Sequence, residues 1–143
     1  MIRQLLRAVS MAGAWALIGL ALVPANMAQA QDATGTWLRE NGASRVRFAA
    51  CGSALCGTIV WLKDPGLDKN NPDEAQRSRP LVGVRVFYDM KPNGGNKWSG
   101  KAYNPEDGKV YTGNMTLDDG KLTTQGCVLG GLICRSVNWS RVN

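Results

Sequence analysis

The chain contains no histidine. Histidine is the commonest general base near neutral pH and a frequent metal ligand, so its absence removes Ser-His and Cys-His nucleophile pairs and the usual metal sites. No Gly-x-Ser-x-Gly nucleophile turn is present either. We therefore expect a protein that is not an enzyme and that holds no metal and no cofactor.

Long apolar runs are also absent after residue 31, but one stands before it. Arg3 and Arg7 precede residues 8–23, which are apolar apart from one serine, and residues 28–30 read Ala-Gln-Ala. A basic start, an apolar core and a small-x-small site are typical of a cleaved signal peptide. The apolar run is too short to span a bilayer comfortably, so we expect no transmembrane segment in the mature chain.

The predicted signal peptide covers residues 1–30 and leaves residues 31–143 as a single small domain in the periplasm or outside the cell. Without Arg3 and Arg7, 15 of the 17 basic residues remain against 11 acidic residues, which leaves a net charge of about +4. A charge this small and this mixed argues against nucleic acid as a partner. The partners that remain are a small molecule or a protein of the cell envelope.

Four cysteines lie in the predicted mature chain, an even number, which in an exported protein favours disulfides. Three connectivities are possible. The local pairing fits best, because each local pair flanks a short turn between expected strands. A zinc site is the rival interpretation, but the spacings of the cysteines and export both disfavour it. The favoured disulfides are Cys51–Cys56 and Cys127–Cys134.

Helical periodicity is scarce after residue 31. Short segments rich in Val, Ile, Thr, Trp and Tyr alternate with turn signals such as Asp118-Asp119-Gly120 and Glu40-Asn41-Gly42. About eight strands at regular spacing indicate an all-β sandwich or an up-and-down barrel. We expect the strands over residues 35–40, 44–50, 57–63, 83–89, 97–103, 109–117, 121–127 and 133–142.

Residues 64–80 interrupt this rhythm with a long polar segment. Asn71 is placed to cap a helix, with Pro72 at its first position and Glu74 at its third, which predicts a short helix that ends at Ser78. A long irregular connection in a compact domain is either a lid over a binding site or a surface crossover.

Aromatic residues on the expected strands are candidates for a ligand site. Alternation places Ile59 and Trp61 on one face of strand 57–63 and predicts that this strand is covered on both faces. Such side chains either line a cavity or fill the interior of a small barrel completely. Arg79 would hold an anionic group at the rim, or pair with acids such as Asp73 and Glu74. The candidate ligand residues are Trp61, Arg79, Trp98, Tyr103 and Tyr111.

Two short motifs stand at opposite ends of the domain. Gly35-Thr36-Trp37 begins the first expected strand, and Trp139-Ser140-Arg141 lies near the end of the last. This pair resembles the lipocalin-like (calycin) pattern, which implies that Trp37 packs against Arg141 where the barrel closes.

A longer series of motifs covers nearly all of the predicted mature chain. It comprises Gly35-Thr36-Trp37, then CGSALCGTIVWLK at 51–63, SRPLVG at 78–83, WSGKAYNPEDGKVY at 98–111 and NWSRV at 138–142. In this order the motifs are similar to those of the exported bacterial domain-of-unknown-function family 2147. The resemblance implies a lipocalin-like antiparallel barrel in the periplasm or outside the cell. With the strands and the short helix expected from the residues, the predicted fold is an eight-stranded up-and-down barrel with one short helix in the 64–80 segment. The resemblance implies no established activity.

Two hypotheses of function follow. In the first, the barrel binds a small apolar or amphipathic ligand in a cavity near one end, under residues 64–80. In the second, the barrel interior is filled, and the protein is an interaction module of the cell envelope without a ligand.

Overall fold

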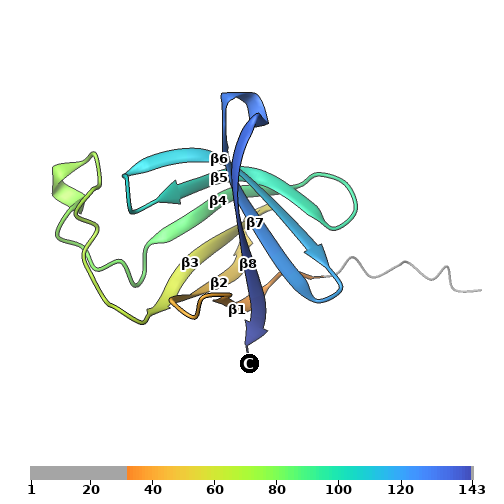
Figure 1. Cartoon of the computed structure of the whole chain (residues 1–143), viewed down its shortest axis with the longest axis horizontal. Coiled ribbons are helices and arrows are strands. Elements are labelled where there is room, and N and C mark those ends of the chain that lie inside the picture. Colours follow the sequence, from red (N-terminus) through yellow and green to blue (C-terminus); the bar gives the residue numbers. More distant parts are fainter. Residues whose placement is uncertain (1–31, 143) are drawn as a thin grey trace, which may run out of the picture.

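The structure, a computed structural model, describes residues 32–142, and the predicted signal peptide lies outside these residues. The chain forms a closed antiparallel barrel in which each strand pairs with the next and the last pairs with the first (Figure 1). The all-β barrel prediction is confirmed. The strands are β1 (Gly35–Arg39), β2 (Ser44–Cys51), β3 (Ala54–Leu62), β4 (Arg85–Pro92), β5 (Lys97–Asn104), β6 (Lys109–Asp118), β7 (Lys121–Val128) and β8 (Ile133–Val142).

Short turns join most of the strands at the positions that the sequence indicates. Asp119 and Gly120 both have positive φ, 47° and 75°, which matches the right-handed twist of the flanking strands β6 and β7. Two single turns of 3-10 helix are also present, η1 (Glu74–Gln76) and η2 (Leu129–Gly131). Within residues 32–142, no helix has the length and apolar character needed to cross a membrane.

The short helix predicted to run from Pro72 to Ser78 is a single turn, and its cap is a different residue. Asp73 caps η1, since its Oδ1 accepts a hydrogen bond of 3.0 Å from the Ala75 amide. The Asn71 side chain instead accepts from the Asp73 amide and donates to Asp68. The Asn71 side chain therefore joins Asp68 to Asp73, and its role as the helix cap was wrongly predicted.

Strands β3 and β4 differ most from their expected bounds. β3 begins three residues early because the β2–β3 turn needs only Gly52 and Ser53. β4 ends three residues late, at Pro92, and carries an irregularity where Asp89 adopts a φ of 52° and the pairing with β5 shifts register. A bulge of this kind bends a strand and tightens the curvature of a barrel.

Large side chains fill the middle of the barrel. The Phe48 and Phe87 rings lie 5.3 Å apart, and Trp139 packs edge-on against Phe87 at 6.5 Å. Gly57 faces these rings, and a Cβ there would come within 2.8 Å of Phe48. The strand backbone thus approaches the aromatic core as closely as glycine allows. The core also contains Trp37, Val46, Ile59, Met90, Trp98, Met115, Leu117 and Leu122.

Both disulfides join neighbouring strands, which confirms the local pairing. Cys127 and Cys134 stand directly opposite each other on β7 and β8, with Cα atoms 4.1 Å apart. Cys51 and Cys56 close the β2–β3 hairpin, with Cα atoms 5.8 Å apart. Two structural disulfides fit a protein that is exported from the reducing cytoplasm.

The up-and-down order gives the barrel two distinct ends. The N-terminal end carries residues 32–34 and the β2–β3, β4–β5 and β6–β7 turns. The loop end carries the β5–β6 turn, the connection over residues 63–84 and η2. In Figure 1 the 63–84 connection lies at the left, and the β7–β8 hairpin ends at the top of the view.

Candidate functional site

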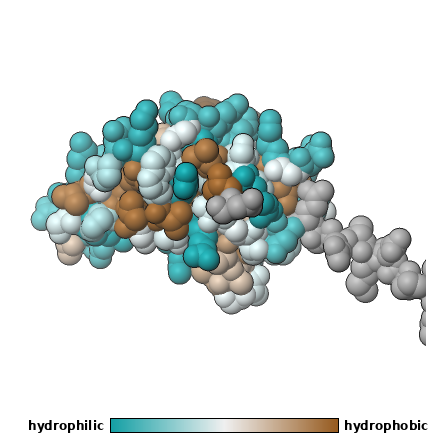
Figure 2. All heavy atoms as spheres, turned by 90° about the horizontal axis from the view of Figure 1, so that it is seen from below, coloured by the Kyte–Doolittle hydropathy of each residue, from teal (hydrophilic) through white to brown (hydrophobic). Residues whose placement is uncertain are grey.

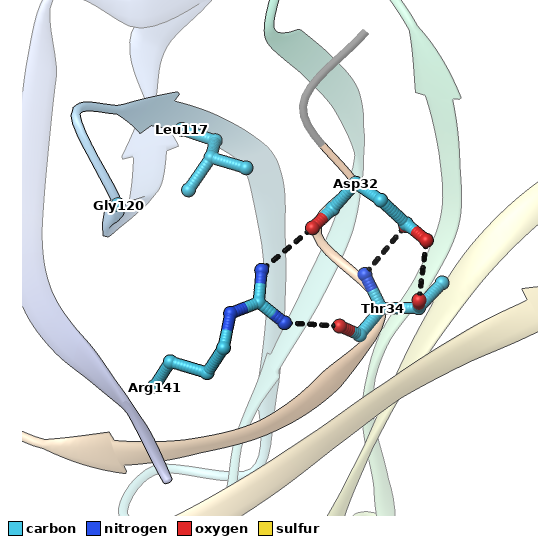
Figure 3. Close-up of a pocket in the computed structure, with 5 residues that line it drawn as sticks. All are labelled: Asp32, Thr34, Leu117, Gly120 and Arg141. Carbon is cyan, nitrogen blue, oxygen red and sulfur yellow. Dashed lines mark hydrogen bonds between the residues drawn. The ribbon is translucent and has the colours of Figure 1, made fainter. Parts of the chain in front are cut away.

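Arg141 closes the N-terminal end of the barrel (Figure 3). Its guanidinium lies 4.3 Å from the centre of the Trp37 ring. Its two terminal nitrogens donate to the backbone carbonyls of Thr34 and Asp32, at 2.6 and 2.7 Å. The Trp37 indole donates to the Ala33 carbonyl at 2.9 Å. The segment that enters β1 is therefore fastened to β8, the contact that the lipocalin resemblance implied.

The Asp32 carboxylate has partners of its own. It accepts hydrogen bonds from the Thr34 amide and hydroxyl, at 2.8 and 2.7 Å. The bonds from Thr34 and the nearby charge of Arg141 hold the pKa of Asp32 below its usual range. Asp32 is therefore ionised at neutral pH and places a negative charge at this end of the barrel.

Two hollows flank the segment around Asp32. The first has a volume of about 500 Å³ and is lined by Asp32, Thr34, Leu117, Gly120 and Arg141. Its polar groups are already bonded to one another, as Figure 3 shows, and Leu117 is its one large apolar side chain. This hollow offers a ligand few free groups.

The second hollow has a volume of about 450 Å³ and lies between the β2–β3 hairpin and the adjoining ends of β4 and β5. We call it the Trp98 hollow. Leu55, Met90 and Trp98 give it apolar walls, and Asp32 and Ser53 supply polar groups. Its size falls within the range of small-ligand pockets. The remaining lining residues are Ala50, Gly52, Ala54 and Pro92.

At the loop end, a buried carboxylate organises the 63–84 connection. Asp68 has no solvent exposure. It accepts a hydrogen bond of 2.6 Å from the Tyr103 hydroxyl and one of 2.9 Å from the Asn71 side chain. Two nitrogens of Arg79, Nε and Nη2, contact one oxygen of Asp68, Oδ2, at 2.9 and 2.8 Å. We call these four residues the Asp68 network.

The protonation states of this network are fixed near neutral pH. Burial opposes ionisation of Asp68, but the hydrogen bonds from Tyr103, Asn71 and Arg79 outweigh it and lower the pKa of Asp68. Burial and the bond to Asp68 raise the pKa of Tyr103 to about 12. The network therefore contains a carboxylate and a neutral phenol, and its evident role is to hold the connection in place.

The five predicted ligand residues do not converge on one cavity. Trp61 lies on the outer surface, 39% exposed, with the Arg45 guanidinium 5.1 Å from its ring centre. Tyr111 lies on the inward side of β6 near the loop end, and its hydroxyl donates to Asp107. Trp98 alone lines one of the two hollows.

The other two candidates are engaged in the Asp68 network. Tyr103 and Arg79 both bond Asp68, so the Arg79 guanidinium is not free at a rim. The sequence offered Asp73 and Glu74 as alternative partners for Arg79. Arg77, not Arg79, forms an ion pair with Glu74, with Nη1 and Oε1 3.6 Å apart.

Sequence reasoning missed Asp68, Leu55 and Met90. Asp68 stands in a polar, turn-rich segment that is typical of a solvated loop, and its partners Arg79 and Tyr103 are distant in sequence. No local pattern marks it. Among residues 32–142, no three His, Cys, Asp or Glu side chains are grouped so that they could share a metal ion.

A closed eight-stranded up-and-down barrel, with a first-strand tryptophan packed on a last-strand arginine, defines a lipocalin-like protein. In agreement, the structure is similar to that of a Helicobacter pylori protein, HP1028, whose description assigns it to the lipocalin family. The TM-score is 0.71 at 22% identity, over 78% of this chain and 84% of that one, which shows a shared fold.

Residues 35–141 match a bacterial family described as "Uncharacterized protein conserved in bacteria (DUF2147)", and the chain belongs to this family. No curated protein matches the sequence.

Proposed function

We propose that this protein is a binding protein, not an enzyme, and that it takes a small apolar or amphipathic molecule into the Trp98 hollow. The observation that carries the proposal is the position of Trp98, a largely buried side chain that lines a hollow of about 450 Å³ together with Leu55 and Met90. Aromatic and aliphatic walls with a few polar groups are the usual lining of a ligand site.

The location follows from how the rest of the barrel is filled. Phe48, Phe87 and Trp139 occupy the middle of the interior, so a ligand there would have to displace packed rings. The Trp98 hollow needs no such displacement. The Cys51–Cys56 disulfide holds the β2–β3 hairpin that forms one wall, which favours a preformed site.

The polar lining suggests how an amphipathic ligand would lie. Its chain would contact Leu55 and Trp98, and its head group would stay near Ser53 and the ionised Asp32. Each buried CH₂ contributes about 0.8 kcal/mol, so the affinity should rise with the length of alkyl chain that the hollow accommodates.

Titrations with dodecyltrimethylammonium and with dodecyl maltoside, each below its micellar concentration, test the proposal. Tryptophan fluorescence and native mass spectrometry report binding. The variant Ala50→Phe places a ring in the hollow and should abolish binding, while Val60→Phe adds the same ring on β3 outside the hollow and should not. Equal binding by both variants, or no binding by the unmodified protein, would refute a ligand site in this hollow.

We also propose that the protein lies outside the cytoplasm and that residues 1–30 are removed as a signal peptide. The pattern of residues 1–30 and the two disulfides support it. N-terminal sequencing of protein from the periplasmic fraction should begin at Gln31. A cytoplasmic protein that begins at Met1 and has reduced cysteines would contradict it.

A second candidate, an envelope interaction module, is favoured by an apolar area on the outer surface. Val60, Trp61 and Val82 are each about two-fifths exposed, and the bond from the Gly83 amide to the Ile59 carbonyl brings the end of the connection beside β3. Figure 2 shows apolar residues on the face seen from below, on the side of the 63–84 connection. Crosslinking from position 61 to one envelope protein, without any ligand, would favour this candidate.

A further inference from the structure

Among residues 32–142, the three most exposed large apolar side chains lie at the tip of the β7–β8 hairpin. Leu132 is 85% exposed, Leu129 69%, Ile133 56% and Val128 38%. They belong to one short stretch, Val-Leu-Gly-Gly-Leu-Ile, between two disulfide-bonded cysteines. Single exposed leucines are common on surfaces, but four adjacent ones of this kind mark an interaction site.

The tip is convex and projects away from the barrel body. In Figure 1 it stands at the top of the view, apart from the 63–84 connection at the left. The Cys127–Cys134 disulfide joins opposed residues at its base. The Leu132 amide donates to the Leu129 carbonyl at 3.3 Å, which satisfies backbone groups inside the turn. An apolar tip with a hydrogen bond inside its turn suits an apolar phase, where free polar backbone groups are costly.

One cation of this hairpin lies near the tip. From residue 121 to residue 143 the sequence holds no aspartate or glutamate, and of its three basic residues Lys121 and Arg141 lie at the N-terminal end of the barrel. Arg135 follows Cys134 directly and is exposed, so a cation stands just behind the apolar tip. An apolar tip backed by a cation complements a bilayer, whose anionic head groups lie above its acyl chains.

We propose that the β7–β8 tip inserts into the surface of an anionic lipid bilayer, with Leu129, Leu132 and Ile133 among the acyl chains and Arg135 at the head groups. The inference goes beyond ligand binding and does not depend on it. The tip lies at the loop end of the barrel and the Trp98 hollow at the N-terminal end, so the hollow would face away from the membrane surface.

Flotation of the disulfide-bonded mature protein with vesicles tests this inference. Binding to vesicles of phosphatidylethanolamine and phosphatidylglycerol should exceed binding to phosphatidylcholine vesicles and should fall as salt is raised. Leu132→Asp should lower the partition coefficient about tenfold or more, and Leu129→Ser should also lower it. Arg135→Gln should remove much of the salt dependence. All three positions are exposed, so circular dichroism should show unchanged folding.

Val82→Asp is the matched control, because it introduces the same charge at an exposed apolar residue outside the hairpin. Equal loss with Val82→Asp and Leu132→Asp would overturn the assignment to the tip. Absence of binding to either vesicle would overturn the proposal. So would a concentration-dependent dimer that Leu132→Asp dissociates, because the tip would then be covered by a second copy of the chain.

Discussion

Tyr103 donates its hydroxyl hydrogen to Asp68 at 2.6 Å and so ties the 63–84 connection to β5 across 35 residues of sequence. Arg79 reaches the same carboxylate from the far side of the connection. Asn70 adds bonds of 3.1 and 3.0 Å to the carbonyls of Pro105 and Glu106 in the β5–β6 turn. The connection is thus a fastened part of the barrel and not a lid held at its two ends alone.

Replacement of Asp68 by asparagine should destabilise the protein by about 2–3 kcal/mol at neutral pH, because Arg79 and Tyr103 lose a buried charged acceptor. Urea unfolding followed by circular dichroism measures the change. Asp118→Asn, at the exposed end of β6, is the control and should change stability by less than about 0.5 kcal/mol. Similar values for the two variants would mean that the network contributes nothing to stability.

The contribution of Asp68 should depend on pH in one direction. Its folded-state pKa is lowered, so the folded protein favours the ionised form. The stabilisation is present in full above the ordinary carboxyl pKa of about 4 and is lost as the pH falls through the folded value. The difference in unfolding free energy between the unmodified protein and Asp68→Asn should therefore shrink between pH 7 and pH 3. A constant difference would contradict this assignment.

Gly108 should tolerate no side chain. Its φ is 70°, and a Cβ would lie 1.9 Å from the Asn70 carbonyl oxygen. Gly42 has nearly the same φ, 73°, and open space around it. Gly42→Ala should cost about 1 kcal/mol for backbone strain alone, and Gly108→Ala clearly more, since the turn must also part from Asn70. Comparison of the two melting temperatures separates the clash from the strain, and equal losses would show that the contact yields freely.

Removal of the Arg141 guanidinium should loosen the N-terminal end of the barrel. Arg141→Ala loses two charged hydrogen bonds and the stacking on Trp37, and should cost about 2 kcal/mol. Arg141→Lys should recover only part of this, because one ammonium does not reproduce the planar fork. Amide exchange should rise most at residues 34–39. Full rescue by lysine would show that charge alone matters.

Each disulfide should contribute about 2 kcal/mol by the loop-entropy relation, because each closes a short loop. Cys51→Ser with Cys56→Ser, and Cys127→Ser with Cys134→Ser, test them separately by urea unfolding. The bridges lie at opposite ends of the barrel, so the two effects should add when all four cysteines are replaced. A large departure from additivity would show that the two hairpins unfold as one unit.

Strand number and order could be predicted from the sequence because turn chemistry is local. Asp119 and Gly120 specify their hairpin whatever surrounds it, and the structure has positive φ at both. Barrel closure could not be predicted in this way, because the alternation of apolar and polar residues along the strands is the same in a sandwich and in a barrel. The Trp37 and Arg141 motifs, through their resemblance to lipocalins, favoured the barrel.

The site was less predictable because a single β-bulge changes whether a side chain points into the barrel or out of it. Alternation placed Trp61 on the same face as Ile59 and predicted a strand covered on both faces. The pairing of β2 with β3 shifts between Arg45 and Val46, so Val46 opposes Ile59 while Arg45 opposes Trp61. Ile59 remains in the core and Trp61 turns outward beside Arg45, so the prediction of a strand covered on both faces is wrong.

Because β1 pairs with β8, the barrel cannot close until the end of the chain is available. Thr36 pairs with Val142 and Arg39 with Trp139, so the seam of the barrel joins its first strand to its last. During synthesis, β1 has only β2 as a neighbour until β8 emerges. The barrel of an incomplete chain therefore remains open. It closes in one late event, when the first strand meets the last.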